Sequence, residues 1–395
     1  MSKLKELIDK YCPNGVEYKR LGDICKVLRG KRLTTRDLSE DGPFPVYHGG
    51  IEPIGYYNNY NREANSVMII NVGASAGTVG FCDKKFWSSD GCYCISHNES
   101  IMQKFLYYAL QTIEFSIKSK VRKAGIPTLD NKEVERIEIP FPPLEIQEEI
   151  VKILDRFAEY TAELQAQLQA RQEQYEYYRN KLLTFNEIGG GIQGVIWMKM
   201  SEIGTFIRGK RFVRTDIVND GVPCIHYGDM YTYYGLYATK SKGMLRNELA
   251  PKMRYAQKND VVIVAAGENK EDIGIGMAWL GDEPAAVHDA CFIFKSDLYP
   301  QYVSHYLRTK YYHKQIVKHV SEGKICSISA KGLGNAIIPI PPYEEQVRIA
   351  TQLNKFDALV SDLVQGLPAE IAAVQKQYEY YRDKLLSFPE YKLSA

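Results

Sequence analysis

The most regular pattern in the chain is a repeat of apolar positions across residues 150–182. Steps of four and three residues connect the positions Ile150, Leu154, Phe157, Thr161, Leu164, Leu168, Arg171, Tyr175, Tyr178 and Leu182. Eight of these ten are apolar or tyrosine, which is typical of a coiled-coil seam that a partner helix covers. We therefore predict a long helix over roughly residues 144–185. The alternative is that this helix packs only on its own globular domain.

A second helix of the same rhythm is predicted over roughly residues 343–388. Its seam positions are Ile349, Leu353, Phe356, Val360, Leu363, Leu367, Ile371, Val374, Tyr378, Tyr381 and Leu385. One extra step of four follows Leu367, beside Gly366 and Pro368, and such an insertion locally unwinds a coiled coil. We predict that the two helices pair in antiparallel fashion and that the second is kinked or interrupted at Gly366.

Short apolar runs that end in glycines precede each long helix, over roughly residues 15–140 and 194–339. The runs at 66–72 and 260–266 predict buried strands. Residues 102–120 and 299–320 are predicted to be helices that pack on the resulting sheets. An I-P-x-P-P segment follows each globular stretch. Because proline is excluded from a helix interior, we predict that each long helix begins after this segment.

The same order of a globular stretch, a proline segment and a long helix occurs twice along the chain. The helix end Q-Y-E-Y-Y-R-N-K-L-L-T-F at 174–185 returns as Q-Y-E-Y-Y-R-D-K-L-L-S-F at 377–388, and R-G-K-R at 29–32 returns at 208–211. Two copies this long indicate a tandem duplication rather than a solenoid. We predict an α+β protein in which two homologous α/β domains are joined by two long helices that form an antiparallel coiled coil with pseudo-two-fold symmetry. The predicted boundaries are 1–140, 141–188, 189–339 and 340–395.

Composition narrows the class of protein. At 395 residues with 45% hydrophobic and 25% charged residues, the chain has the composition of a multidomain globular protein. Eight cysteines without a C-x-x-C pair, no apolar stretch of about 18 residues and no signal-peptide pattern predict a cytoplasmic protein without a membrane partner.

The net charge of +2 hides two local basic clusters. One lies in each half. The first comprises Lys19, Arg20, Lys26, Arg29, Lys31, Arg32 and Arg36, and the second comprises Lys199, Arg208, Lys210, Arg211 and Arg214. Clustered Lys and Arg side chains are what contacts to nucleic-acid phosphates require. The alternative for any such run is a solvated surface, but the tetrapeptide R-G-K-R persists in halves that otherwise differ widely. We predict that these clusters contact a DNA backbone.

Loops rich in Tyr, His and Asn follow each basic cluster, and Tyr is about twice as frequent as Phe. Such side chains read base edges or stack on bases, so the candidate DNA-binding residues are Tyr47, His48, Tyr57, Asn58, Asn59 and Arg62 in the first half, and His226, Tyr227, Asp229, Tyr231, Tyr233, Asn269 and Lys270 in the second. The alternative is surface turns whose tyrosines pack on the sheet. The loops align in position but differ in residues, as expected of two domains that read different half-sequences.

Catalytic motifs are missing from the sequence. The glycine-rich stretch 73–80 lacks the Lys-Ser/Thr of a P-loop. The stretch G-E-N-K at 267–270, with Asp260 upstream, resembles the acid-x-Lys arrangement of metal-dependent nucleases. The aligned first-half stretch 73–76 carries neither an acid nor a lysine, so we predict a DNA-contacting loop there instead. Cys92, Cys94 and His97 lack a fourth zinc ligand, so we predict core cysteines, no catalytic residues and no metal site.

These features together resemble the specificity (S) subunit of type I restriction–modification systems. The shared motifs are Y-C-P-N-G-V-E-Y at 11–18, L-G-D-I at 21–24, both I-P-x-P-P-x-E-x-Q segments and both Y-Y-R-x-K-L-L helix ends. The resemblance covers essentially the whole chain. It implies two target recognition domains that each read half of a bipartite double-stranded DNA target, and two helices that set the spacer between the half-sites.

The resemblance also implies the partners. Two methyltransferase (M) subunits would dock on the helices, at an interface that includes Tyr175, Tyr178, Leu182, Tyr378, Tyr381 and Leu385. The M subunits would carry S-adenosylmethionine, and restriction (R) subunits joined through them would use ATP and Mg²⁺, so no cofactor is expected in this chain. The break at Gly366 departs from a straight second helix and leaves the spacer length open.

Two other functions stay open at this point. One is a two-headed adaptor whose coiled coil binds protein and whose tyrosine-rich loops bind peptide or glycan. The other is the same kind of subunit in a related bifunctional enzyme whose partner fuses the nuclease to the methylase.

Overall fold

The computed structural model describes residues 2–185, 194–361 and 366–391, and these fall into two compact units. Unit 1 takes the described residues up to Gln165 and those from Glu370 onward, and unit 2 takes those from Ala166 to Ala369. Helix α6 (Leu144–Thr184) therefore begins in unit 1 and ends in unit 2. The predicted boundary between 188 and 189 lies outside the described residues.

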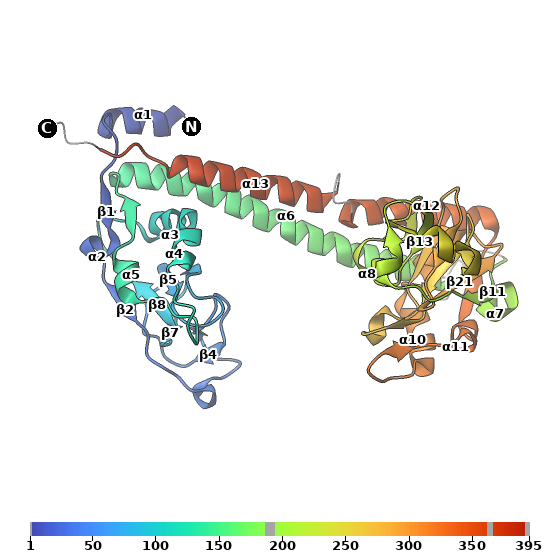
Figure 1. Cartoon of the computed structure of the whole chain (residues 1–395). Coiled ribbons are helices and arrows are strands. Elements are labelled where there is room, and N and C mark those ends of the chain that lie inside the picture. The colour runs from blue at the N-terminus through green and yellow to red at the C-terminus, as the bar shows by residue number, and fades with distance from the viewer. Residues whose placement is uncertain (1, 186–193, 362–365, 392–395) are drawn as a thin grey trace. The chain divides into compact units, whose positions relative to one another are not determined.

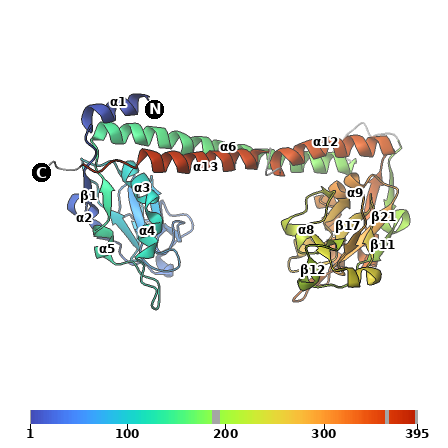
Figure 2. The same cartoon turned by 45° about the horizontal axis from the view of Figure 1, so that its top comes forward.

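Unit 1 carries the first globular stretch, which contains a four-stranded sheet in the order β2-β8-β5-β6 and a three-stranded sheet in the order β4-β3-β7. The strands are β2 (Val27–Arg29), β3 (Phe44–Tyr47), β4 (Gly55–Tyr57), β5 (Ser66–Ile70), β6 (Val79–Cys82), β7 (Trp87–Ser88) and β8 (Cys92–Ile95). The helices of this stretch are α1 (Ser2–Tyr11), α2 (Leu21–Ile24), α3 (Gln103–Thr112), α4 (Glu114–Ser119) and α5 (Asn131–Glu135). Helix α3 packs on β5 and β6 (Figure 2).

Unit 2 repeats this topology with more strands. Its two five-stranded sheets have the orders β11-β21-β17-β19-β14 and β12-β15-β13-β20-β16. The strands are β11 (Gly204–Arg208), β12 (Ile217–Val218), β13 (Val222–Ile225), β14 (Tyr237–Ala238), β15 (Gly243–Leu245), β16 (Tyr255–Ala256), β17 (Val261–Val264), β19 (Gly276–Trp279), β20 (Ala285–Val287) and β21 (Cys291–Ser296). The helices are α7 (Met200–Ile203), α8 (Asp229–Thr232), α9 (Pro300–Tyr306), α10 (Lys310–Ile316) and α11 (Ala330–Gly334), and the strand pair β18 (Ala266–Gly267) and β22 (Cys326–Ser327) completes the stretch.

The duplication predicted from the sequence is visible strand by strand. The order β2-β8-β5-β6 in unit 1 corresponds to β11-β21-β17-β19 in unit 2, and the parallel pair β3·β7 corresponds to the parallel pair β13·β20. Even the turn before the central strand recurs, because Asn65 and Asn259 both adopt positive φ, at 56° and 75°. Asparagine tolerates this left-handed conformation better than most residues. The prediction of two homologous domains is confirmed.

The proline segments enter the long helices through short antiparallel strand pairs, β1 (Tyr18–Arg20) with β9 (Glu138–Pro140), and β10 (Ile196–Lys199) with β23 (Ile337–Ile340). A buried glutamine in the first turns of each helix then ties the segment to the head. The Gln147 amide accepts from the Met102 N–H at 2.9 Å and donates to the Pro142 carbonyl at 2.8 Å. Gln346 makes the equivalent bonds to the Tyr299 N–H and the Pro341 carbonyl, both at 2.9 Å. This explains the glutamine that both copies share.

The second long helix is interrupted, as predicted from Gly366 and Pro368. Helix α12 (Tyr343–Ser361) ends before Gly366, which forms a bend, and helix α13 (Leu367–Leu385) begins after it. Pro368 is the second residue of α13. A backbone N–H at this position would have no hydrogen-bond partner within the helix, so proline costs no helical hydrogen bond here. The seam position Leu363 lies outside the described residues.

Antiparallel helix pairing occurs within unit 1, where α13 runs beside the start of α6 (Figures 1 and 2). Phe157 stacks on Tyr381 with ring centroids 5.6 Å apart, and Tyr160 donates to the Glu370 carboxylate at 2.7 Å. In unit 2, Tyr178 of α6 stacks on Phe356 of α12 at 5.7 Å. The seam prediction is thus confirmed within each unit.

The helices predicted at 102–120 and 299–320 are each broken in two. Helix α3 ends at Thr112 and α4 begins at Glu114, while α9 ends at Tyr306 and α10 begins at Lys310. Thr309 caps α10, since its hydroxyl accepts from the Tyr312 N–H at 3.2 Å. A capping threonine is a sequence signal for the start of a helix, and a prediction from apolar periodicity alone does not use it. None of the helices in the described residues has the length and apolarity needed to cross a bilayer.

We expect that Gln147→Met lowers the melting temperature of the chain. The substitution keeps the side-chain volume but leaves the Met102 N–H and the Pro142 carbonyl without partners, which costs about 2–4 kcal/mol. Thermal unfolding followed by circular dichroism measures the effect. Gln165→Met is the matched control, because this exposed residue lies on the same helix, and equal melting temperatures for the two variants would contradict the role assigned to Gln147.

Candidate nucleic-acid interface

Each unit presents a basic arm, defined as residues 29–36 in unit 1 and 208–214 in unit 2, which continues from strand β2 or β11. The glycine of R-G-K-R lets the arm approach the neighbouring strand closely. A Cβ on Gly30 would lie 1.9 Å from the Ser89 carbonyl oxygen, and one on Gly209 would lie 2.2 Å from that of His288. The next residue then bonds that strand, through Lys31 N–H to the Ser88 carbonyl in unit 1. The repeated glycine is therefore required by packing.

The cations that flank this glycine point outward. Lys31, Arg32 and Arg36 in unit 1 are exposed, as are Lys210, Arg211 and Arg214 in unit 2. Among the residues that the structure describes, no carboxylate lies within 4.0 Å of any of these six side chains. Two predicted members of the first cluster are already engaged, because Lys19 pairs with Glu17 at 3.3 Å and Arg20 pairs with Glu138 at 3.6 Å. The arms thus hold the cations that remain available to an anionic ligand.

Arg29 and Arg208 begin the arms and have their backbone held by a second arginine. The Arg62 guanidinium donates to the Arg29 carbonyl at 2.8 Å, and that of Arg254 donates to the Arg208 carbonyl at 2.7 Å. Arg62, predicted to bind DNA, is half-buried and supports the arm in this structure. Arg254 was not predicted, and because the two arginines stand at different positions of their units, no sequence signal connected them.

The first-half loop residues separate into buried and exposed groups. Tyr47 is buried in a small core cluster and donates to Cys82 Sγ at 3.8 Å. Tyr57 packs edge-on against Trp87, at 5.2 Å between ring centroids. Asn58 and Asn59 are exposed, while His48 is half-exposed and its Nδ1 accepts from the Gly91 N–H at 3.2 Å. Of the residues in this loop that are predicted to contact DNA, His48, Asn58 and Asn59 are accessible at the surface.

The predicted residues of the second-half loop also separate into buried and exposed groups. Asp229 is buried and pairs with Lys242 at 2.8 Å. The Tyr231 hydroxyl is buried against Gly267 and has no hydrogen-bond partner among the described residues. Tyr233 is exposed. Asn269 donates to Asp272 at 3.1 Å, and Lys270 forms an ion pair with Glu322. Lys270 is therefore neutralised by a residue that lies far along the chain, which sequence inspection could not anticipate.

One concavity of about 770 Å³ gathers several predicted residues of unit 2. The predicted lining residues are Arg211, Arg214, His226 and Tyr227, and the unpredicted ones are Phe212, Val213, Ala266, Gly267, Glu268, His288, Asp289, Ala290, Lys324 and Ile325. Burial is the main reason that the pKa values of His226 and His288 are lowered. The two histidines are thus neutral at pH 7.

The predicted subunit-interface residues face inward at the helix ends. Tyr175 and Leu385 are buried, Leu182 packs against the core of unit 2, and Tyr378 and Tyr381 pack against the core of unit 1. Tyr178 is partly exposed and covered by Phe356. Whether another subunit touches these six side chains stays a prediction, since here they are engaged within the chain.

The cysteines predicted to be structural lie in the core, with Cys92 and Cys94 fully buried on β8. His97 bonds the Ser66 hydroxyl at 2.9 Å. In the described ranges no group of three or more His, Cys, Asp or Glu side chains is placed to hold a metal ion.

Sequence comparison identifies relatives over the full length of the chain. The model of the type I restriction modification DNA specificity domain matches residues 13–174 and again 195–373. The specificity subunit of type I restriction enzyme EcoR124I/EcoR124II from Escherichia coli is 30% identical, over 99% of this chain and 98% of its own. A putative type I restriction enzyme specificity subunit from Haemophilus influenzae is also 30% identical, over 94% of this chain and 96% of its own.

Solved structures share the fold. The S subunit of a type I restriction–modification system from M. genitalium superposes with a TM-score of 0.59 at 18% identity, covering 94% of this chain and 96% of that one. A chain from a structural study of the assembly of the type I R-M system gives 0.61 at 19% identity, covering 95% and 98%.

We expect that Gly209→Ala destabilises unit 2, because the added methyl group would meet the His288 and Val287 carbonyl oxygens at 2.2 and 2.3 Å. Overpacking of this kind costs about 1–3 kcal/mol. Thermal unfolding of the full chain measures the loss. Gly235→Ala is the control, since no atom of the described residues lies within 4 Å of its Cβ position. A Gly209→Ala variant as stable as this control would refute the close approach.

Proposed function

Because this chain belongs to the type I restriction–modification DNA specificity family, we propose that it is the non-catalytic subunit that selects the DNA sequence on which its partner subunits act. The head of each unit reads one half of a bipartite target in double-stranded DNA. The observation that carries this proposal is the pair of basic arms, which hold unpaired cations in the same backbone setting in both units. DNA phosphates are the anions that such arms suit.

The two long helices are proposed to set the spacer between the half-sites and to dock two methyltransferase subunits. S-adenosylmethionine is proposed to bind these partners, and ATP and Mg²⁺ the restriction subunits that join through them. The chain's own residues then contribute binding, orientation and the choice of sequence. Family membership favours this function over a peptide- or glycan-binding adaptor.

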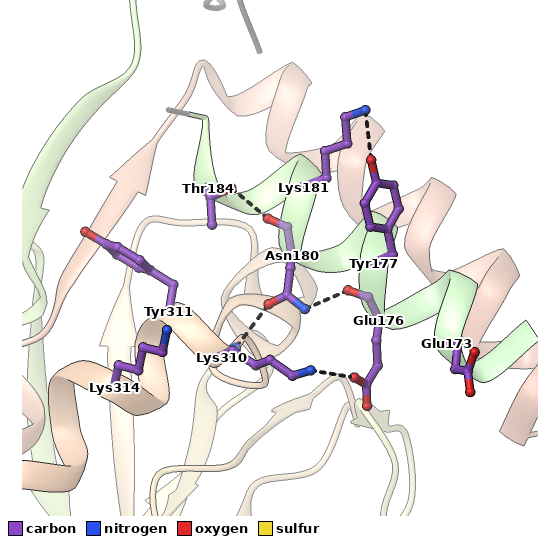
Figure 3. Close-up of a pocket in the computed structure, with 9 residues that line it drawn as sticks. All are labelled: Glu173, Glu176, Tyr177, Asn180, Lys181, Thr184, Lys310, Tyr311 and Lys314. Atoms are coloured by element: carbon purple, nitrogen blue, oxygen red, sulfur yellow. Dashed lines mark hydrogen bonds and ion pairs between the residues drawn. The ribbon is translucent and has the colours of Figure 1, made fainter. Parts of the chain in front are cut away.

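The docking surface for a methyltransferase subunit is proposed to lie on the outward face of each repeated helix end. In unit 2 a cavity of about 730 Å³ opens between α6 and α10 (Figure 3). Lys310 pairs with Glu176 at 3.3 Å, and the Lys310 N–H donates to Asn180 Oδ1 at 3.0 Å. The helix end is thus held firmly on its head, and Tyr177 remains 58% exposed beside the cavity.

The end of α13 in unit 1 presents the same exposed pair. Lys181 lies over the Tyr177 ring at 5.4 Å, and Lys384 lies over the Tyr380 ring at 5.6 Å. Tyr380 is 59% exposed, close to the 58% of Tyr177. Exposed tyrosines are frequent anchors of protein interfaces. Two equivalent surfaces on one chain support two copies of one partner.

We expect that Lys31→Ala combined with Arg32→Ala weakens the binding of the assembled complex to all DNA sequences alike. The slope of log K against log salt is negative, and each lost phosphate contact makes it shallower by roughly 0.9. The double variant should therefore make the slope shallower by about 1.8. Filter binding or fluorescence anisotropy at several salt concentrations measures the slope. The control is Lys19→Ala with Arg20→Ala, which removes the same charge from residues already paired with carboxylates. An arm variant whose slope equals the wild-type slope would sink this assignment.

We expect that Tyr177→Ala or Tyr380→Ala alone weakens the binding of one of two methyltransferase subunits by about 10-fold or more, because each removes one aromatic anchor. Native mass spectrometry of the complex at limiting partner concentration counts the bound subunits. Gln172→Ala, an exposed change on the same helix as Tyr177, should leave both subunits bound. Two bound subunits at wild-type affinity in both tyrosine variants would place the docking surface elsewhere.

A further inference from the structure

The concavity of unit 2 is built from four segments that the fold brings together. The basic arm contributes Arg211 to Arg214, the end of β13 is followed by His226 and Tyr227, the loop after β20 contributes His288 to Ala290, and Gly267 with Glu268 closes one side. It has a volume of about 770 Å³ and includes exposed cations of the basic arm in its lining. It is thus a candidate for the recognition of bases.

Four rings form its floor. His226 packs on Tyr227 at 4.7 Å and on His288 at 4.8 Å between ring centroids, and Phe212 meets His288 edge-on at 5.1 Å. Rings that pack on one another in this way hold each imidazole in a single orientation. The polar edges of the two histidines are therefore presented in fixed directions.

A backbone hydrogen bond fixes the tautomer of His226, because the Gly228 N–H donates to His226 Nδ1 at 3.2 Å. His288 Nδ1 lies 3.1 Å from the Ala290 N–H and 3.2 Å from the Asp289 carboxylate. A neutral imidazole whose Nδ1 accepts carries its proton on Nε2. His288 is further bonded to the backbone of Phe212. Among the described residues, His226 Nε2 has no protein partner, which leaves one oriented donor for a ligand.

The charged groups of the concavity suit the edge of a base pair better than they suit a phosphate. Arg214 lies beside Gly228, with one guanidinium nitrogen 3.0 Å from the position of a Cβ on that residue, and so lies next to His226. Arg211 and Lys324 are also exposed and unpaired in the described part of the chain. Two carboxylates line the same concavity: Glu268, which has no partner among the described residues, and Asp289, which lies 3.2 Å from His288 Nδ1. A carboxylate repels phosphate, whereas a base pair offers donors as well as acceptors.

We propose that this concavity reads a G·C base pair through the major groove, with Arg214 and His226 as donors to O6 and N7 of guanine and Glu268 as acceptor from N4 of cytosine. Guanine is the base that presents two acceptors side by side on this edge, whereas adenine presents a donor next to its acceptor and thymine a methyl group. The assignment rests on the DNA-recognition function proposed above and adds the base that unit 2 requires.

Unit 1 cannot read the same base in the same way. The strand registers align His48 with His226, but Tyr227, His288 and Arg214 are replaced by Gly49, Ser89 and Thr35. The imidazole of His48 reaches the Gly91 N–H instead, the bond that His288 makes to Ala290 in unit 2. The G·C requirement is thus confined to the half-site of unit 2.

The test is selection of bound duplexes from a random DNA library by the full chain assembled with its methyltransferase subunits. Exchange of residues 194–339 for those of another family member first identifies the half-site of unit 2. In that half-site the wild-type complex should require one G·C pair. Arg214→Gln and His226→Phe should each lower the preference for guanine there by about 5- to 150-fold, the equivalent of one good base contact. His226→Phe keeps the ring stack, and exposed Arg214 can be replaced without opening the core.

The controls are Lys240→Gln, an exposed change outside the concavity, and His48→Phe in unit 1. Neither should change the half-site of unit 2. A half-site without G·C, unchanged guanine preference in both variants, or an equal loss of affinity for all sequences by folded Arg214→Gln would each overturn the reading. A wild-type complex with no sequence preference would instead refute the proposed function itself.

Discussion

The packing of each repeated helix end against a head is the constraint on which the rest of the structure depends. In unit 2, Tyr175 of α6 meets His305 at 3.3 Å, and His305 bonds Asn354 of α12 at 2.8 Å. Burial lowers the pKa of His305 to about 3, so its imidazole is neutral at pH 7. In unit 1, Tyr378 of α13 donates to Gln111 at 3.0 Å and packs on Tyr108. Each core is therefore completed by the helix that follows the other head.

This exchange explains why the helix ends are the best-preserved part of the duplication. Tyr175 and Tyr378 bury one edge in a head, while Tyr177 and Tyr380 on the opposite face stay exposed. A single sequence of twelve residues thus serves both the interior of a unit and its outer surface. Divergence on the buried face would cost stability, and divergence on the exposed face would cost the proposed contact with a methyltransferase subunit.

The periodicity of apolar residues predicted the helices, the break at Gly366 and the repeated heads, because these depend on local spacing. It could not tell which face of the seam a head would cover, and Tyr175 and Leu385 are buried within their own units. It also could not pair Lys270 with Glu322 or place Glu268 and Lys324 near Arg214. Those neighbours come from distant segments that only the sheet topology brings together.

The two heads combine a shared framework with different surfaces. Gly30 and Gly209 keep the arms in the same place, because a side chain at either position would collide with a carbonyl oxygen. Around that fixed backbone the residues change freely, from Gly49 to Tyr227 and from Ser89 to His288. Phosphate contacts depend on the framework and are the same for every sequence, whereas base contacts depend on the variable side chains. In the proposed function, a duplicated chain of this kind holds DNA alike at both heads and still distinguishes two unlike half-sites.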